Sequence, residues 1–191
     1  MDEAGRGPLA GPVVAGAVLL HRFDFTVPLD DSKRLTPIAR ERAYRAILRA
    51  GSIGVGAAGP EEVDRIGIHA ATHLAMLRAL AKLPAKPELV LVDGKFVPRG
   101  CPYPALAVVK GDGRSLAVCC ASIVAKVVRD QWMGLIHQLY PEYGFLRHKG
   151  YGTSQHVERI QQLGPCAFHR YSFRPIRPPA AAELAELLDE R

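Results

Sequence analysis

The chain has 191 residues, close to the length of one typical domain. Hydrophobic residues make up 48% and charged residues 23%, a globular composition that excludes a largely disordered chain. The formal charge is +6, and because the last nine residues carry four acids against one arginine, residues 1–182 alone carry +9. Such a basic body suggests an anionic partner but does not identify it.

The sequence predicts neither a membrane-spanning segment nor a signal peptide for secretion. The apolar run over residues 13–20 has eight residues, whereas about 20 are needed to cross a bilayer. Acidic residues and Arg6 precede it rather than a basic leader, so we expect no signal peptide. The four cysteines lack the C-x-x-C spacing of zinc sites. We therefore expect a reduced, cytoplasmic protein.

The first half of the chain alternates strands and helices. Residues 12–20 are apolar and β-branched, which predicts a strand. A helix is expected after Thr36, an N-cap residue followed by proline, and is expected to end at Gly51. A short strand over residues 52–58 follows. The next helix, over residues 68–80, is predicted by apolar residues at three-and-four spacing.

The second half contains two more strands, over residues 88–93 and 105–110, and the longest helix. This helix is predicted from Ser115 to about Tyr140. Its apolar side is expected to carry Ile123, Val127, Trp132, Leu135, Ile136 and Leu139.

A further helix is predicted near the end, capped by Thr153 and stopped by Gly164. We expect a mixed α/β fold with a catalytic domain over residues 1–174 that includes a helical C-terminal extension. Residues 175–191 are expected to form a proline-rich link and a short terminal helix.

Four carboxylates lie where local structure explains them poorly. They are Asp2, Glu3, Asp93 and Asp130. The first two precede a glycine-rich turn and the third ends an apolar strand. The fourth shares a helix face with Ser122 and Lys126. Acids from separate elements can hold Mg²⁺ or Mn²⁺, and two such ions about 3.5–4 Å apart can activate water against a phosphodiester. Taken singly, Asp130 is equally well explained by an ion pair with Lys126, and Asp93 by a strand-ending turn.

Two glycine-containing segments are candidates for substrate contact. Residues 5–12 do not match G-x-G-x-x-G, but their glycines let the backbone approach a ligand such as a sugar hydroxyl. An ordinary tight turn is an equal alternative. Tyr151 lies between glycines and follows Arg147 and Lys149, which suits phosphate contact and stacking. A polar loop with a packed tyrosine is the alternative.

Five other basic residues are further phosphate candidates, although each taken singly is better explained as a solvated side chain. They are Lys33, Arg34, Lys110, Arg129 and Arg170. Three histidines, His148, His156 and His169, lack metal-ligand spacing and receive no role.

Read together, these segments resemble ribonuclease HII. Seven motifs follow the family's order through nearly the whole chain. They lie at residues 2–14, 31–35, 92–94, 109–112, 121–130, 143–153 and 169–173. The resemblance implies a ribonuclease H-like fold, a mixed β-sheet flanked by helices. It implies an endonuclease that cuts the RNA strand of RNA–DNA hybrids and cuts 5′ to single ribonucleotides in duplex DNA, leaving 3′-hydroxyl and 5′-phosphate ends.

The resemblance also implies residue roles. The metal-binding acids would be Asp2, Glu3, Asp93 and Asp130, with two Mn²⁺ or Mg²⁺ ions. The 2′-hydroxyl would be read largely through the backbone of Gly5, Arg6 and Gly7, and Tyr151 would stack on the deoxyribose that follows the ribonucleotide. Helpers around the phosphates would be Lys33, Lys110, Ser122, Lys126 and Arg129. We expect a monomer whose partners are these nucleic acids.

The chain departs from the family at its start. Members usually carry several apolar residues before the Asp-Glu pair, and here only Met1 precedes it. We expect this form to lack part of a strand's hydrogen-bond ladder and to place a positive α-amino group close to the acids. It should then be less stable or less active than a form extended upstream.

Two other functions remain open from the sequence. A non-catalytic hybrid-binding module would favour lysine or arginine at the acidic positions. A small-molecule phosphohydrolase could use the same acids, but it would not need the basic loop around Tyr151.

Overall fold

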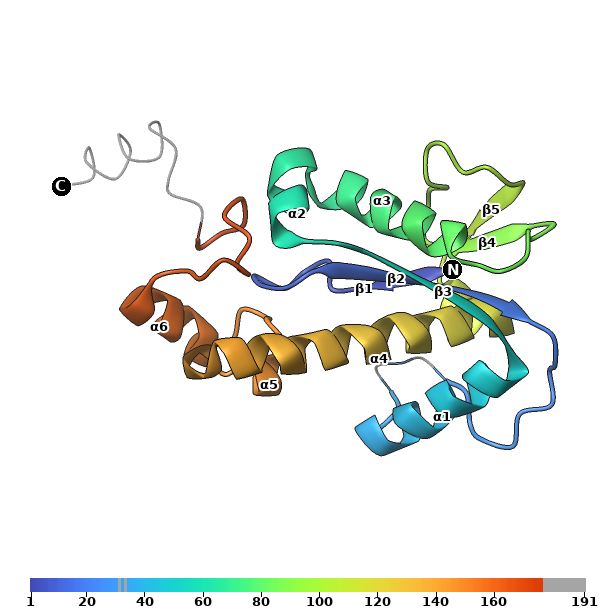
Figure 1. Ribbon diagram of the computed structural model, residues 1–191, viewed down its shortest axis with the longest axis horizontal. Coiled ribbons are helices and arrows are strands. Elements are labelled where there is room, and N and C mark those ends of the chain that lie inside the picture. Colours follow the sequence, from blue (N-terminus) through green and yellow to red (C-terminus); the bar gives the residue numbers. More distant parts are fainter. Residues whose placement is uncertain (31, 33, 177–191) are drawn as a thin grey trace.

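Five strands form a central sheet with helices on both faces (Figure 1). The computed structural model describes residues 1–30, 32 and 34–176. The strands are β1 (Asp2–Ala4), β2 (Val13–Leu20), β3 (Gly51–Ala58), β4 (Val90–Asp93) and β5 (Ala105–Val108). The α-helices are α1 (Pro37–Ala50), α2 (Pro60–Ile66), α3 (Ile68–Ala81), α4 (Leu116–Leu139), α5 (Phe145–His148) and α6 (Ser154–Leu163). Two 3₁₀ turns, η1 (Gly111–Gly113) and η2 (Pro141–Tyr143), complete the order.

The sheet combines antiparallel and parallel pairs. Strands β1, β2 and β3 pair antiparallel in that order, and β4 pairs parallel with β5. Met1 joins the two groups, because its amino nitrogen donates to the Leu91 carbonyl and its own carbonyl accepts from Asp93 N at 2.9 Å. In a parallel pair of strands, one residue bonds to two residues of the neighbouring strand that are two positions apart. Met1 does this with Leu91 and Asp93, so β1 runs parallel to β4. The mixed α/β fold expected from the sequence is therefore confirmed.

Several helix boundaries follow the capping signals in the sequence. Thr36 Oγ1 accepts from Ala39 N at 3.2 Å, with proline in the first turn of α1, and Gly51 ends that helix. Thr153 caps α6 in the same way, and α4 begins directly after Ser115. Helix α2 was not predicted. Its signals are a proline at the first helical position and Glu62, which accepts from Gly59 N at 3.1 Å.

The predicted strand over residues 105–110 is too long. It ends at Val108, because Lys110 has a left-handed backbone with φ 55° and opens the turn η1. That turn places Asp112 directly beyond the end of β5.

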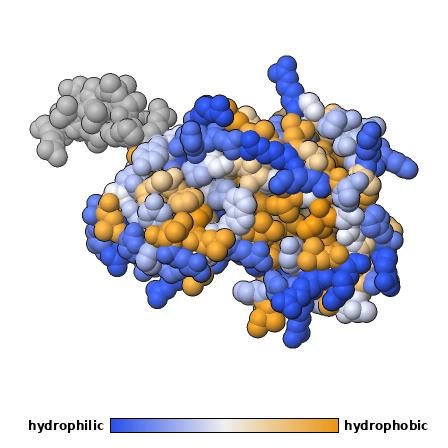
Figure 2. Space-filling view, in the orientation of Figure 1, coloured by the Kyte–Doolittle hydropathy of each residue, from blue (hydrophilic) through white to orange (hydrophobic). Residues whose placement is uncertain are grey.

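The outer face of α4 differs from the prediction. Trp132, Leu135 and Leu139 are 42%, 59% and 68% exposed, although they were expected on the apolar side of a buried helix. The C-terminal half of α4 buries Met133 and Ile136 instead, in a cluster with the α5–α6 region. The three exposed residues repeat at i, i+3 and i+7, so they form a separate outward stripe. Figure 2 shows hydrophobic residues open to solvent on this face of the molecule.

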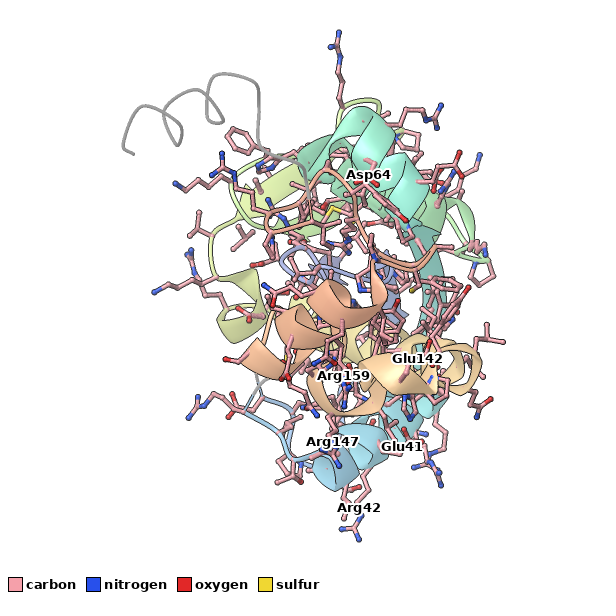
Figure 3. The ribbon with its side chains drawn as sticks, turned by 90° about the vertical axis from the view of Figure 1, so that its left-hand side faces the viewer. Glu41, Arg42, Asp64, Glu142, Arg147 and Arg159 are labelled. Atoms are coloured by element: carbon pink, nitrogen blue, oxygen red, sulfur yellow. The ribbon has the colours of Figure 1, made fainter. Side chains whose placement is uncertain are left out.

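The segment after α6 returns to the sheet and to α2. Asp64 of α2, labelled in Figure 3, accepts from Tyr171 N at 2.8 Å and from Ser172 N at 2.9 Å. Residues 175–191, predicted as a link and a terminal helix, lie outside the described residues apart from Pro175 and Ile176. No helix in the described part of the chain is long and apolar enough to cross a membrane.

Small residues let the helices approach the sheet closely. A Cβ added at Gly56 of β3 would lie 2.1 Å from the Ala75 carbonyl oxygen of α3. On the other face of the sheet, a Cβ at Gly16 of β2 would lie 2.6 Å from the Ala121 carbonyl oxygen of α4. Both contacts are too short for any side chain, so these glycines set the distance between the layers.

We predict opposite effects for alanine at two glycines. Gly56→Ala should lower the free energy of unfolding by about 1–3 kcal/mol, because α3 must move away from the sheet. Gly134→Ala should raise it by about 0.5–1 kcal/mol, because this glycine lies within α4 with open space at its Cβ position. Urea denaturation of both variants measures the two changes. Equal effects would contradict the close packing of α3 on β3.

Candidate active site

A cavity of about 480 Å³ opens at one edge of the sheet, where β1, β4 and β5 end. Four carboxylates lie on its walls. They are Asp2 and Glu3 of β1, Asp93 at the end of β4, and Asp112 just beyond β5. Because these strands run parallel, their carboxyl ends meet at the same edge, where open α/β sheets bind ligands. Asp93 is held there by Gly111 N, which donates to its Oδ1 at 2.7 Å.

Burial gives these acids unusual proton affinities. Asp2 is 6% exposed, and its pKa is raised to about 7, first by burial and then by the charges of Glu3 and Asp93. Burial also raises the pKa of Glu3, while Arg6 opposes the rise through a 3.3 Å ion pair. The site thus holds more negative charge than its surroundings neutralise.

The donor atoms suit a hard divalent cation. Within the described residues, no three Asp, Glu, His or Cys side chains form a compact cluster ready to hold one ion. The carboxylates instead surround the cavity and offer oxygen atoms, which Mg²⁺ and Mn²⁺ prefer. The negative charges of Glu3 and Asp93 repel that of Asp2. A bound cation would relieve this repulsion. The residues present therefore fit such an ion.

The structure does not bring Asp130 into this carboxylate set. Its Oδ1 accepts from Lys126 Nζ at 2.7 Å, and its Oδ2 accepts from Arg40 Nη1 at 3.3 Å. Lys126 and Arg40 line the cavity, whereas Asp130 does not. The helical ion pair considered from the sequence is thus present, and Asp112 rather than Asp130 lines the cavity with the other three acids. The sequence did contain a signal for Asp112, because this acid follows the strand predicted over residues 105–110 just as Asp93 ends the strand predicted over residues 88–93.

Arg129 and Arg170 are both buried, and both donate to backbone carbonyls. Arg129 donates to the carbonyls of Ala10, Pro12 and Lys149 at 3.0–3.1 Å, and it also lines the cavity. Arg170 donates to the carbonyls of Gly5, Arg6 and Gly11 at 2.6–3.1 Å and does not line the cavity. Both hold the glycine-rich turn, so neither is a solvated surface side chain, and the phosphate contacts expected of them stay a prediction.

The glycine turn and Tyr151 line the same cavity as the acids. Its lining includes Gly5, Arg6, Gly7 and Tyr151. Tyr151 is 46% exposed, and a Cβ at Gly7 would lie 3.9 Å from its ring. The Arg6 guanidinium contacts Glu3 and His69 Nδ1, the latter at 3.0 Å. The two segments predicted to contact substrate therefore lie side by side.

The remaining predicted helpers lie in different places. Ser122 is buried in the cavity wall, 2.9 Å from Ser32 Oγ, and Lys126 also lines the cavity. Lys110 is exposed and does not line the cavity, and Arg34 pairs with Asp30 at 3.3 Å. Lys33 lies outside the described residues.

Comparison with known proteins agrees with this geometry. The family model described as Ribonuclease HII matches residues 1–176. The chain belongs to the ribonuclease HII family. Ribonuclease HII of Chlamydia trachomatis serovar A is 48% identical over 179 residues, which cover 93% of this chain and 82% of that protein.

Solved structures share the fold. Ribonuclease H2 from Pyrococcus horikoshii OT3 matches with a TM-score of 0.72 and 28% identity, over 92% of this chain and 93% of that one. Bst-RNase HIII in complex with Mn²⁺ matches with a TM-score of 0.68 over 100% of this chain and 69% of that one; at 19% identity it shows the fold alone. As a member of the ribonuclease HII family, the chain is a hydrolase with ribonuclease H activity on RNA–DNA hybrids.

We predict that Asp2 destabilises the metal-free protein at high pH. A carboxyl group with a raised pKa keeps its proton in the folded state, so stability falls as pH rises from about 4 to about 7. Asp2→Asn removes this penalty and still accepts from Glu3 N. Without metal, its melting temperature should exceed that of the wild type by roughly 5 °C at pH 8 and match it near pH 4. A variant that melts below the wild type at pH 8 would contradict this.

Proposed function

We propose that this ribonuclease HII cuts on the 5′ side of single ribonucleotides in duplex DNA, as well as within RNA–DNA hybrids, and leaves 3′-hydroxyl and 5′-phosphate ends. One observation carries the proposal: four carboxylates line the same cavity as a glycine turn and a half-exposed tyrosine. The acids suit phosphodiester hydrolysis, and the turn with the tyrosine suits recognition of a sugar.

The metal-binding residues in this proposal are Asp2, Glu3, Asp93 and Asp112, holding two Mg²⁺ or Mn²⁺ ions. Divalent cations bound there would neutralise phosphate charge and lower the pKa of a water molecule. The Mn²⁺ held by the distant relative Bst-RNase HIII supports the choice of a divalent cation. Asp130 is assigned to positioning Lys126 and Arg40 at the cavity wall, through its two ion pairs.

Backbone amides of the glycine turn are proposed to read the 2′-hydroxyl. Arg170 draws the carbonyls of Gly5 and Arg6 inward. In a trans peptide the N–H points opposite to the carbonyl, so the amides of Arg6 and Gly7 point away from Arg170. Neither amide has an acceptor among the described residues. They are therefore free to donate to a sugar hydroxyl, the group that distinguishes RNA from DNA.

Tyr151 is proposed to stack on the deoxyribose that follows the ribonucleotide. Its ring lies against Gly7 at the cavity edge, so one sugar at the turn and the next at the ring would be read together. This arrangement would let the enzyme sense the junction from RNA to DNA.

We further propose that the enzyme acts as a cytoplasmic monomer. All four cysteines are free thiols, as in a reducing compartment. Residues 1–174 would form its catalytic domain and residues 175–191 an appended link and helix. The alternative of a non-catalytic binding module does not fit an enzyme family. The small-molecule phosphohydrolase is not favoured, because a compact substrate would leave the Tyr151 wall without a role.

We predict that substitutions of Asp112 and of Asp130 differ in their effect on catalysis. Asp112→Asn should reduce cleavage of a duplex with one ribonucleotide by at least about 100-fold, because it removes a ligand charge from the cavity. Asp130→Asn should cost roughly 10-fold or less, because it only loosens Lys126 and Arg40. Rates with Mg²⁺ and with Mn²⁺ measure both. A greater loss for Asp130→Asn would restore that residue as a metal ligand.

We also predict that the turn recognises the ribonucleotide through its backbone and not through the Arg6 side chain. Gly7→Val should lower the rate on the single-ribonucleotide duplex by about 10-fold or more, because the side chain would enter the space between the turn and Tyr151. Arg6→Ala should cost less, because its guanidinium contacts Glu3 and His69. Comparable losses would show that the Arg6 side chain itself reads the substrate.

A further inference from the structure

Three buried histidines lie directly behind the Tyr151 loop. His156 and His169 are fully buried and His148 is 9% exposed. The His148 ring stacks on His156 at 4.2 Å between centroids, and Phe145 packs against both. His156 lies on the inner side of α6, whereas Arg159 of the same helix is exposed at the end of the molecule seen in Figure 3. Histidines in this cluster have no part in the chemistry described above.

Hydrogen bonds determine the tautomer of His148. Gly150 N donates to its Nδ1 at 3.2 Å, so that nitrogen carries no proton. Its Nε2 lies 2.7 Å from the Tyr143 carbonyl, which can only accept, so Nε2 is protonated. The ring therefore holds the backbone just before Tyr151.

The same reasoning determines a chain through the other two rings. Cys166 N donates to His169 Nδ1 at 2.9 Å, so the proton of that ring is on Nε2. His169 Nε2 lies 3.0 Å from His156 Nε2, which must accept. The proton of His156 is then on Nδ1, which donates to the Tyr151 carbonyl at 2.9 Å. Burial lowers the pKa of His156 and His169 to about 4, so both rings are neutral at pH 7, as this chain requires.

The far end of the chain reaches the glycine turn. His169 pairs with Ala10 in an isolated β-bridge. The next residue, Arg170, holds the carbonyls of Gly5, Arg6 and Gly11. One dipeptide therefore contacts the turn through Arg170 and the Tyr151 backbone through His169 and His156.

Tyr151 depends on this support because few side chains pack against its ring. The ring is nearly half exposed, and its neighbours are Gly7, which has no side chain, and the Arg129 guanidinium, 5.9 Å from the ring centroid. The backbone of Tyr151 therefore has a large part in placing the ring. The Tyr151 carbonyl receives one hydrogen bond from Thr153 N and one from His156 Nδ1, both at 2.9 Å.

We infer that His156 and His169 are positioning residues for substrate recognition: they fix the Tyr151 ring at its distance from the Gly5–Gly7 turn, and the preference for an RNA–DNA junction depends on them. This inference rests on the proposed role of Tyr151. It assigns no contact between either histidine and the substrate.

The test uses two amides that each mimic one nitrogen of the His156 ring. In His156→Asn, the amide nitrogen falls near the place of Nδ1 and still donates to the Tyr151 carbonyl. In His156→Gln, the amide reaches the place of Nε2 and contacts His169 instead. The measured quantity is kcat/KM on a single-ribonucleotide duplex divided by kcat/KM on a continuous RNA–DNA hybrid.

We expect His156→Asn to keep most of the wild-type ratio. We expect both His156→Gln and Tyr151→Ala to lower it about tenfold. Ile160→Ala is the matched control, because Ile160 is buried on the same helix one turn further and belongs to the apolar cluster rather than to the hydrogen-bonded chain. It should lower the melting temperature and leave the ratio unchanged. A wild-type ratio in His156→Gln, or an equal loss in Ile160→Ala, would overturn the inference.

A second measurement needs no variant. Nitrogen-15 NMR of the histidine rings at pH 7 should show His156 with its proton on Nδ1, and His148 and His169 with theirs on Nε2. A charged His156, or one protonated on Nε2 alone, would overturn the chain. If Tyr151→Ala leaves the ratio unchanged, the proposed role of Tyr151 fails and the inference fails with it. If Tyr151→Ala lowers the ratio and His156→Gln does not, only the inference fails.

Discussion

Two buried guanidinium groups underlie the recognition side of the active site. Arg129 and Arg170 make no ion pair among the described residues, and their donors go to backbone carbonyls. Burying a charge without such partners costs far more than a hydrogen bond returns, so the turn must bring its carbonyls to these groups. Gly5 shows how little room remains, since a Cβ there would lie 2.0 Å from Arg129 Nε. The same inward carbonyls turn the Arg6 and Gly7 amides toward the cavity, so the support of the turn and its proposed ability to read a sugar have one cause.

The cavity is lined by groups of opposite charge. Burial and mutual repulsion raise the pKa of Asp2 to about 7, while four basic side chains, those of Arg6, Arg40, Lys126 and Arg129, line the same cavity. A phosphodiester brings negative charge that suits these basic groups and conflicts with the acids. A divalent cation on the acids would remove that conflict and would couple substrate binding to metal binding through electrostatics.

Local signals in the sequence were sufficient to predict several helix boundaries. Thr36 with Pro37, Ser115, and Thr153 with Gly164 each mark a real helix boundary, because capping depends on nearby residues. What the sequence missed depends on distant ones. Periodicity placed Trp132 on a buried face, but the neighbours of α4 change along its length, and only tertiary contacts decide which stripe is covered. Asp112 was overlooked because convergence with Asp93 requires β4 and β5 to be parallel neighbours, which spacing does not reveal. The burial of Arg129 could not be predicted for a related reason, because its carbonyl partners in the turn lie 117 and 119 residues away.

The acids and the glycine turn also differ in how the chain assembles them. The acids lie at the ends of the central strands, since Met1 and β4 exchange hydrogen bonds and β4 pairs with β5. The turn is held from the far end of the described chain, because Arg170 bonds to carbonyls 159 to 165 residues earlier. The neighbouring His169 contacts His156, which in turn contacts the Tyr151 carbonyl. One dipeptide therefore supports both the glycine turn and the backbone of Tyr151, two segments far apart in the sequence.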